Sequence, residues 1–170
     1  VVTRPLEDYS LGEARLIASE NPCSFLHLIS PELDFPYLRG SRQELIYKTI
    51  SENLESFLNN SFIEQLEQAT LFIYRVKNQD RVHTGYWVLT SVFDNKEGVI
   101  LKHEQTVSRR EKLLADYLQQ TTLDAIPVLI THEKNNKLEH YIKNYTNKAA
   151  DFDFQYSDGS IHKLWAIKDE

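Results

Sequence analysis

The residues Thr70-Leu-Phe-Ile-Tyr-Arg-Val76 and His83-Thr-Gly-Tyr-Trp-Val-Leu-Thr-Ser-Val-Phe93 decide the expected fold of this chain. Both runs are rich in aromatic and β-branched side chains, which favour strands. Only a short segment, the polar turn 77–81 and Val82, separates them, so together they predict an antiparallel hairpin. The apolar run 86–89 within the second strand predicts burial on both faces of the sheet.

A second hairpin is expected near the end of the chain. Phe152, Phe154 and Tyr156 alternate with polar residues, Asp158-Gly159 supplies a tight turn, and a strand over 161–167 returns. His162 and Trp165 fall on opposite faces of that strand, where both are expected to pack. Three shorter apolar runs predict further strands, at 23–29, at 99–101 and at 125–130, the last at a sheet edge because Pro127 cannot donate a ladder hydrogen bond.

Helices are expected between these strands. Three segments match the capping-box pattern, in which a serine side chain and a glutamate three residues later satisfy free amides at a helix start: 10–13, 41–44 and 108–111. They predict helices over 11–19, 42–58 and 109–120, and apolar spacing predicts a last helix over 138–145. Residues 1–9 are expected to be extended and 30–36 to form an irregular loop. The sequence therefore predicts an α+β fold with a mixed, mainly antiparallel sheet and about four helices, in a single domain over 1–170.

Bulk composition excludes several classes of function. The chain has 170 residues and one cysteine, Cys23, so no intrachain disulfide forms and a reducing, cytoplasmic compartment is favoured. No apolar run has the roughly 20 residues that cross a bilayer. The net charge is −6 and basic residues are scattered, which argues against a nucleic-acid partner. No membrane partner is expected either, since no long apolar run is present. No histidine spacing is typical of metal ligands, so no metal is expected; the cofactor and the oligomeric state stay open.

The stretch Lys102-His-Glu-Gln-Thr106 is the densest group of chemically useful side chains. His103 and Glu104 are candidates for a general acid–base pair. If the segment is extended, Lys102, Glu104 and Thr106 share one face and could bind a small anionic ligand such as a phosphate. The alternative is a solvated strand end with a local ion pair.

Two further residues are candidate ligand-binding groups. Arg109 lies at an expected helix N-terminus, where free amides favour anions, although simple capping is the favoured interpretation. His27 shares a strand face with Phe25 in the expected strand, and a packed or edge histidine is more common there than a functional one.

Three stretches together resemble a known family. They are Asn21-Pro-Cys-Ser-Phe-Leu-His27 with 31–34, Gly98-Val-Ile-Leu-Lys-His-Glu104 with Thr106, and Asp158-Gly159 with His162 and 164–165. This pattern resembles the N-terminal region of the bacterial and archaeal domain-of-unknown-function family 1015, over nearly the whole chain. The resemblance implies a longer protein whose second half carries an Asp-Gly-His-His-Arg motif, similar to the phosphate-binding signature of ParB-like and sulfiredoxin-like folds. That motif is absent here, so a truncated or diverged member is expected.

The departures from the family pattern shape the functional hypotheses. Apolar or aromatic residues replace usual polar ones at Val107, at Leu113-Leu114 and at Tyr117, and Leu6-Glu7 replaces a Tyr-Asp pair. These changes favour a non-catalytic binding or interaction module. The alternative, supported by Lys102, His103, Glu104 and Thr106, is the N-terminal half of a nucleotide-dependent, phosphotransferase-like enzyme.

Overall fold

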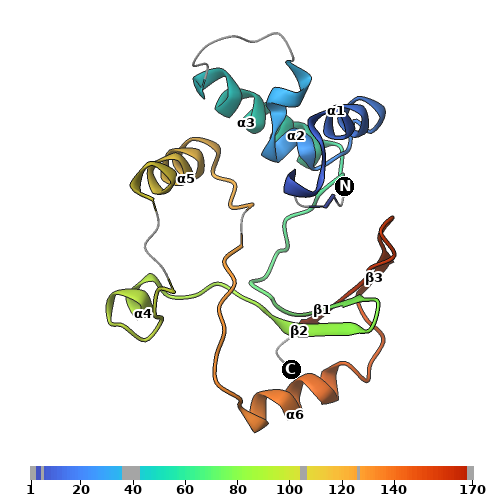
Figure 1. The fold of residues 1–170 in the computed structure, drawn as a ribbon, viewed down its shortest axis with the longest axis vertical. Coiled ribbons are helices and arrows are strands. Elements are labelled where there is room, and N and C mark those ends of the chain that lie inside the picture. The colour runs from blue at the N-terminus through green and yellow to red at the C-terminus, as the bar shows by residue number, and fades with distance from the viewer. Residues whose placement is uncertain (1–2, 5, 36–42, 104–106, 126, 168–170) are drawn as a thin grey trace. The chain divides into compact units, whose positions relative to one another are not determined.

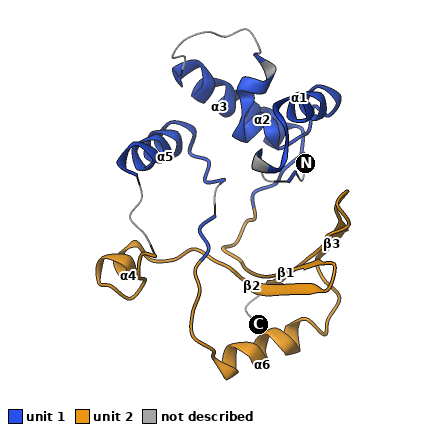
Figure 2. Ribbon diagram, viewed as in Figure 1, with its two compact units in different colours: residues 1–65, 104–129 blue, residues 66–103, 130–170 orange. Residues whose placement is uncertain are grey.

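The computed structural model describes residues 3–4, 6–35, 43–103, 107–125 and 127–167. Its elements confirm the α+β class, with six α-helices and one four-stranded sheet among these residues (Figure 1). Every strand pairing is antiparallel, so the sheet is not mixed. The chain divides into two compact units, residues 1–65 with 104–129 and residues 66–103 with 130–170 (Figure 2). The expectation of one domain over 1–170 stays a prediction.

The first unit is helical. It contains a 3-10 turn η1 (Leu6–Asp8), α1 (Leu11–Glu20), α2 (Leu26–Ile29), a second 3-10 turn η2 (Pro31–Asp34), α3 (Gln43–Asn59) and α5 (Ser108–Thr121). The capping box at Ser10 and Glu13 is present: Glu13 donates its amide to the Ser10 hydroxyl, and Ser10 donates its amide to the Glu13 carboxylate. A core of Ala14, Ala18, Leu26 and Leu33 lies between α1, α2 and η2.

The second unit contains the sheet. Its strands are β1 (Leu71–Asn78), β2 (Arg81–Trp87), β3 (Phe152–Gln155) and β4 (Ile161–Ile167), in the spatial order β2-β1-β4-β3. Both expected hairpins are therefore confirmed, and β1 and β4 join them. Two helices, α4 (Val92–Lys96) and α6 (Asn136–Tyr145), complete the unit. The side chain of Asn135 caps α6 by accepting the amides of Lys137 and Leu138.

The two faces of the sheet differ in what covers them. On one face, Ile73 and Trp165 are partners across β1 and β4 and are buried. Tyr86, on the same face, donates its hydroxyl to the Leu138 carbonyl, so α6 lies over this side. On the other face His162 stacks on the rings of Phe154 and Tyr74, at centroid distances of 5.1 and 5.9 Å. The prediction that His162 and Trp165 pack on opposite faces is confirmed.

Three expected strands are absent from the described residues. Segment 23–29 contains the helix α2 instead, because the Asn21 and Ser24 side chains accept the amides of Cys23 and Leu26 and close local turns. Segment 99–101 follows α4, and in the part of 125–130 that the structure describes no strand forms. In this segment Val128 and Leu129 are 83% and 90% exposed. An apolar run therefore does not form a strand here, because no strand among the described residues pairs with it.

Several other segments differ from expectation. The second strand ends at Trp87, and Leu89 is 97% exposed, so burial on both faces of 86–89 was wrong. Ser91 then caps α4 by accepting the amide of Phe93, which begins a helix where strand was expected. Residues 6–8 and 31–34 form 3-10 turns where extended chain and irregular loop were expected.

Candidate functional site

A row of polar side chains crosses the sheet on the face that α6 covers. The register pairs Thr84 with Arg75, Arg75 with Lys163, and Lys163 with Asp153, so each of the four strands contributes one residue. Side chains at directly paired positions point to the same face. The row therefore lies at one level across β2, β1, β4 and β3.

Arg75 is held by neutral groups. Its Nε donates to the Thr84 hydroxyl at 3.0 Å and an Nη donates to the Thr146 hydroxyl at 3.1 Å. The guanidinium also lies over the buried Trp165 ring, 5.4 Å from its centroid. A guanidinium has five N–H donors, so three remain for another acceptor. Within the described residues, no carboxylate lies at ion-pair distance from Arg75, so none of them neutralises its charge.

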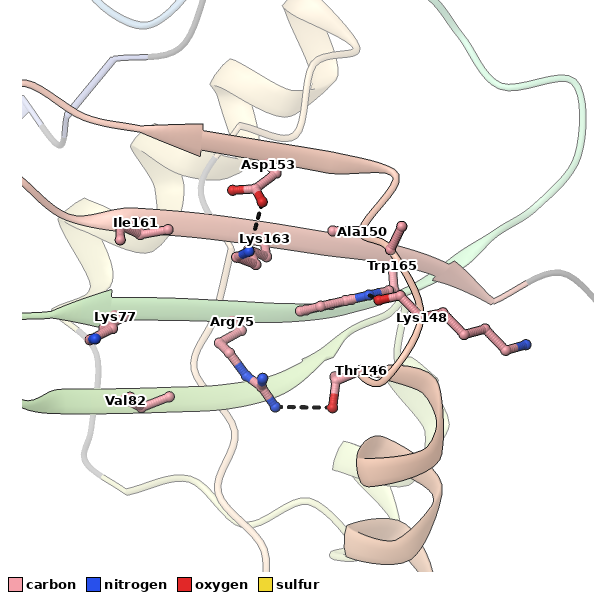
Figure 3. A pocket seen from close by; sticks show the side chains of 11 residues that line it. Arg75, Lys77, Val82, Thr146, Lys148, Ala150, Asp153, Ile161, Lys163 and Trp165 are labelled. Atoms are coloured by element: carbon pink, nitrogen blue, oxygen red, sulfur yellow. Dashed lines mark hydrogen bonds and ion pairs between the residues drawn. The ribbon is translucent and has the colours of Figure 1, made fainter.

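The neighbouring cation, Lys163, is paired. Its ammonium nitrogen lies 2.6 Å from a carboxylate oxygen of Asp153, and both side chains are partly exposed. Figure 3 shows Asp153 directed toward Lys163 and Arg75 directed toward Thr146. Like charges at directly opposed positions of an antiparallel pair destabilise a sheet, so Arg75 beside Lys163 is unfavourable unless an anion lies near both.

Arg75, Lys163 and Asp153 line an open cavity of about 580 Å³. Its wall also includes Lys77, Val82, Ile161 and, after α6, Thr146 and residues 148–150. The Trp165 indole N–H donates to the Lys148 carbonyl at 3.0 Å and fixes that segment against the sheet. The Lys148 side chain itself extends away from Arg75 (Figure 3), and its ammonium lies over the Tyr145 ring. We call this cavity the sheet groove.

A second polar cluster lies on the other face of the sheet. Burial raises the pKa of Tyr74, which keeps its hydroxyl protonated, and this hydroxyl is 2.6 Å from His162 Nδ1. Ser160 donates its hydroxyl to Asp158, so the His162 Nε2–H is the donor in the 2.8 Å contact between His162 and Ser160. Every hydrogen in this chain of contacts is used between protein groups. Because Ser160 is also buried, we assign the cluster to holding the β3–β4 hairpin.

None of the proposed residues that the structure describes, Lys102, His103, His27 and Arg109, lines the sheet groove. Lys102 and His103 are exposed and belong to the sheet unit, whereas His27 and Arg109 belong to the helical unit. Glu104 and Thr106 lie outside the described residues. The convergence of Lys102, Glu104 and Thr106, and the acid–base pairing of His103 with Glu104, therefore stay predictions.

The local structure around the candidates differs from that expected. After α4 the chain reverses at Gly98, whose φ is 76°, and the amides of Gly98 and Val99 donate to Asn95 and Asp94 carbonyls. This is a Schellman helix end rather than a strand entering the 102–106 stretch. At α5 the N-cap is Val107 and makes no side-chain cap, so the expected capping box at Ser108 does not form.

His27 has a local structural role. Its Nε2 lies 3.1 Å from the Ala18 carbonyl and 3.2 Å from the Asn21 carbonyl, at the end of α1. Its own carbonyl accepts the Asn53 side-chain amide from α3. These contacts connect α1, α2 and α3. The strand face that His27 was expected to share with Phe25 does not form, because the segment is helical, and a ligand-binding role for His27 stays a prediction.

Comparison with known proteins places the chain in one family. A family model described as "Protein of unknown function (DUF1015)" matches residues 1–170. The chain belongs to the DUF1015 family. This confirms the resemblance seen in the sequence motifs. No curated protein and no solved structure gives a match.

The sheet groove of this DUF1015 protein was not found from sequence. Arg75, Lys163 and Asp153 are far apart in the chain, and only the strand register brings them together. One signal was present: the turn at Asp158-Gly159 fixes the hairpin register, which places Asp153 opposite Lys163. No helix in the described part of the chain is both long and apolar enough to cross a membrane. No group of metal-ligating side chains occurs among those residues either.

Proposed function

We propose that the protein is a binding module for a small anionic molecule, which it holds in the sheet groove through Arg75 and Lys163. The observation that carries the proposal is the unneutralised guanidinium of Arg75. Two hydroxyls orient it, and the remaining N–H donors fit the planar, bidentate geometry that carboxylates and phosphates accept. The proposal keeps the non-catalytic binding module expected from the sequence. It places the binding residues in the sheet groove and not in the stretch 102–106.

The charges of the groove support an anion over a cation. Arg75, Lys77 and Lys163 line the groove with one carboxylate, Asp153, in a protein whose net charge is −6. The C-terminal end of α6 adds roughly half a negative charge near Thr146. Three cations outweigh these two contributions, so a ligand oxyanion is favoured near Arg75.

The size of the groove supports a small molecule. Ligand pockets of about 300–1,000 Å³ are typical of small-molecule sites, and the groove falls in that range. Val82 and Ile161 supply apolar contact beside the cations. A catalytic role belongs to the alternative hypothesis, the N-terminal half of a phosphotransferase-like enzyme. Two of its candidate residues, Glu104 and Thr106, lie outside the described residues.

The test is a titration of the protein with inorganic phosphate, followed by calorimetry or by amide chemical shifts of β1 and β4. Arg75→Met should weaken binding at least about tenfold, because a hydrogen bond to a charged group is worth about 1.5–3 kcal/mol. Arg81→Met is the matched control: it removes the same charge from the other face of the sheet.

Two results would contradict the proposal. One is equal phosphate affinity in Arg75→Met and the unaltered protein. The other is an equal loss in Arg81→Met, which would indicate long-range charge rather than a site. Thermal melting of each variant establishes that the fold is kept, since Arg75→Met also removes contacts to Thr84 and Thr146.

A further inference from the structure

Asp153 occupies the position that a ligand anion would take at Lys163. Its carboxylate is 2.6 Å from the Lys163 ammonium, whereas the adjacent Arg75 has no carboxylate partner in the described residues. The two cations are direct cross-strand partners, and Asp153 reaches only one of them. The Lys163 ammonium has further N–H donors, but an oxyanion that bridges both cations would lie beside the Asp153 carboxylate. Repulsion between these two anions favours displacement of Asp153 from Lys163.

We infer that Asp153 is an internal competitor for the sheet groove and that the ligand which displaces it is a phosphate monoester in its dianionic form. This inference rests on the proposed function of the groove. The Lys163 and Asp153 side chains are 38% and 51% exposed. Exposed ion pairs are weak because water screens them, so the pair is readily opened by a ligand of higher charge.

The charge requirement follows from the exchange. A monoanion that replaces Asp153 forms an ion pair with Lys163 in place of the one that the carboxylate loses. Its net gain is therefore only the added contact with Arg75. A phosphate monoester carries nearly two negative charges above its second pKa near 6 and has three acceptor oxygens. It can accept from Arg75 and Lys163 together, which a carboxylate already held by its own strand cannot do.

The first experiment compares methyl phosphate with methyl sulfate, which has a similar shape but one negative charge. At pH 8 methyl phosphate should bind more tightly than methyl sulfate, and the difference should shrink at pH 5, where both are monoanions. Equal affinities at pH 8 would overturn the assignment of a dianion.

The second experiment removes the competitor. Asp153→Asn should tighten methyl phosphate binding about two- to fivefold, the range expected from an exposed ion pair. Glu139→Gln is the matched control. It makes the same charge change in another exposed pair, Lys134 with Glu139, which does not line the groove. Unchanged or weaker binding in Asp153→Asn would overturn the inference, since weaker binding means that Asp153 contacts the ligand.

A double-variant cycle separates competition from general repulsion. In a Lys163→Met background, Asp153→Asn should have little effect on methyl phosphate affinity, because the competition acts through the Lys163 ammonium. If Asp153→Asn raised methyl phosphate affinity equally with and without Lys163, its effect would be simple charge repulsion. That result would contradict the competitor role. Failure of the proposed function looks different: methyl phosphate and inorganic phosphate then fail to bind in an Arg75-dependent way in any variant.

Discussion

At the scale of single residues, Arg75 and Lys163 show how a sheet can hold two cations side by side. The two cations are stabilised by different interactions. Two hydroxyls accept hydrogen bonds from Arg75, and one carboxylate forms an ion pair with Lys163. Cross-strand like charges cost stability, and this cost is one reason for the proposal that the pair binds an anion.

The buried tryptophan that supports the groove gives the first prediction. Trp165 is 3% exposed and bonds to the Lys148 carbonyl, whereas Trp87 is 50% exposed. Trp165→Phe should lower the free energy of unfolding by about 1–2 kcal/mol, through lost packing and a lost hydrogen bond. Trp87→Phe should change it by less than about 0.5 kcal/mol. Denaturant unfolding of both variants checks this, and equal effects would contradict the assigned burial.

The capping box at α1 gives a prediction about pH. Hydrogen bonds from Ser10 to the Glu13 carboxylate hold the pKa of Glu13 below the ordinary glutamate value. A carboxyl group whose pKa is lower in the folded than in the unfolded protein stabilises the fold at pH values above the unfolded pKa. This contribution is lost as the pH falls through the folded pKa. Carbon-detected NMR titration should find a low pKa for Glu13 and a rise in Ser10→Ala. An unshifted pKa in both proteins would show that the box does not persist in solution.

At the scale of elements, the success of the sequence predictions depends on local signals. The helices α1, α3, α5 and α6 were predicted within a few residues, and both hairpins were predicted to exist, because turn, cap and periodic patterns act within one element. The end of β2 was not predicted: it lies at Trp87 and not at Phe93. The strands expected at 23–29, 99–101 and 125–130 were wrong, because a short apolar run does not specify whether a pairing partner exists. Residues such as Ser24, Ser91 and Gly98 close local turns that the apolar pattern did not reveal.

The β3–β4 turn gives a prediction at this scale. Gly159 has a φ of 85°, in the left-handed region, and donates its amide to the Tyr156 carbonyl. Gly159→Ala should destabilise the protein by about 1–2 kcal/mol, because a Cβ is strained in that conformation. Gly12→Ala, in α1 with open space around it, should instead stabilise by up to about 1 kcal/mol. Melting temperatures that move in the same direction would contradict the argument.

At the scale of the whole molecule, the sequence predicted the family and the fold class but not the groove. Net charge, composition and motif order are properties of the whole chain and could be read directly. The row from Thr84 to Asp153 depends on β1 pairing with β4, which no local pattern encodes. The candidates at 102–106 stay predictions, since Glu104 and Thr106 lie outside the described residues.

The overall charge gives a prediction about partners. With a net charge of −6, the protein should not bind duplex DNA appreciably at about 150 mM salt, because such binding is driven by phosphate neutralisation. Fluorescence anisotropy with a labelled duplex checks this. Submicromolar binding that weakens steeply with added salt would contradict it.

The strand order β2-β1-β4-β3 has a consequence for the kinetics of folding. Each hairpin closes over a short turn and can form within microseconds, but the β1–β4 seam joins distant parts of the chain and is slower. Thr84 with Arg75 and Lys163 with Asp153 belong to separate hairpins, so the row is complete only after this seam closes. A phosphate ligand should therefore slow unfolding while leaving the early folding rate unchanged.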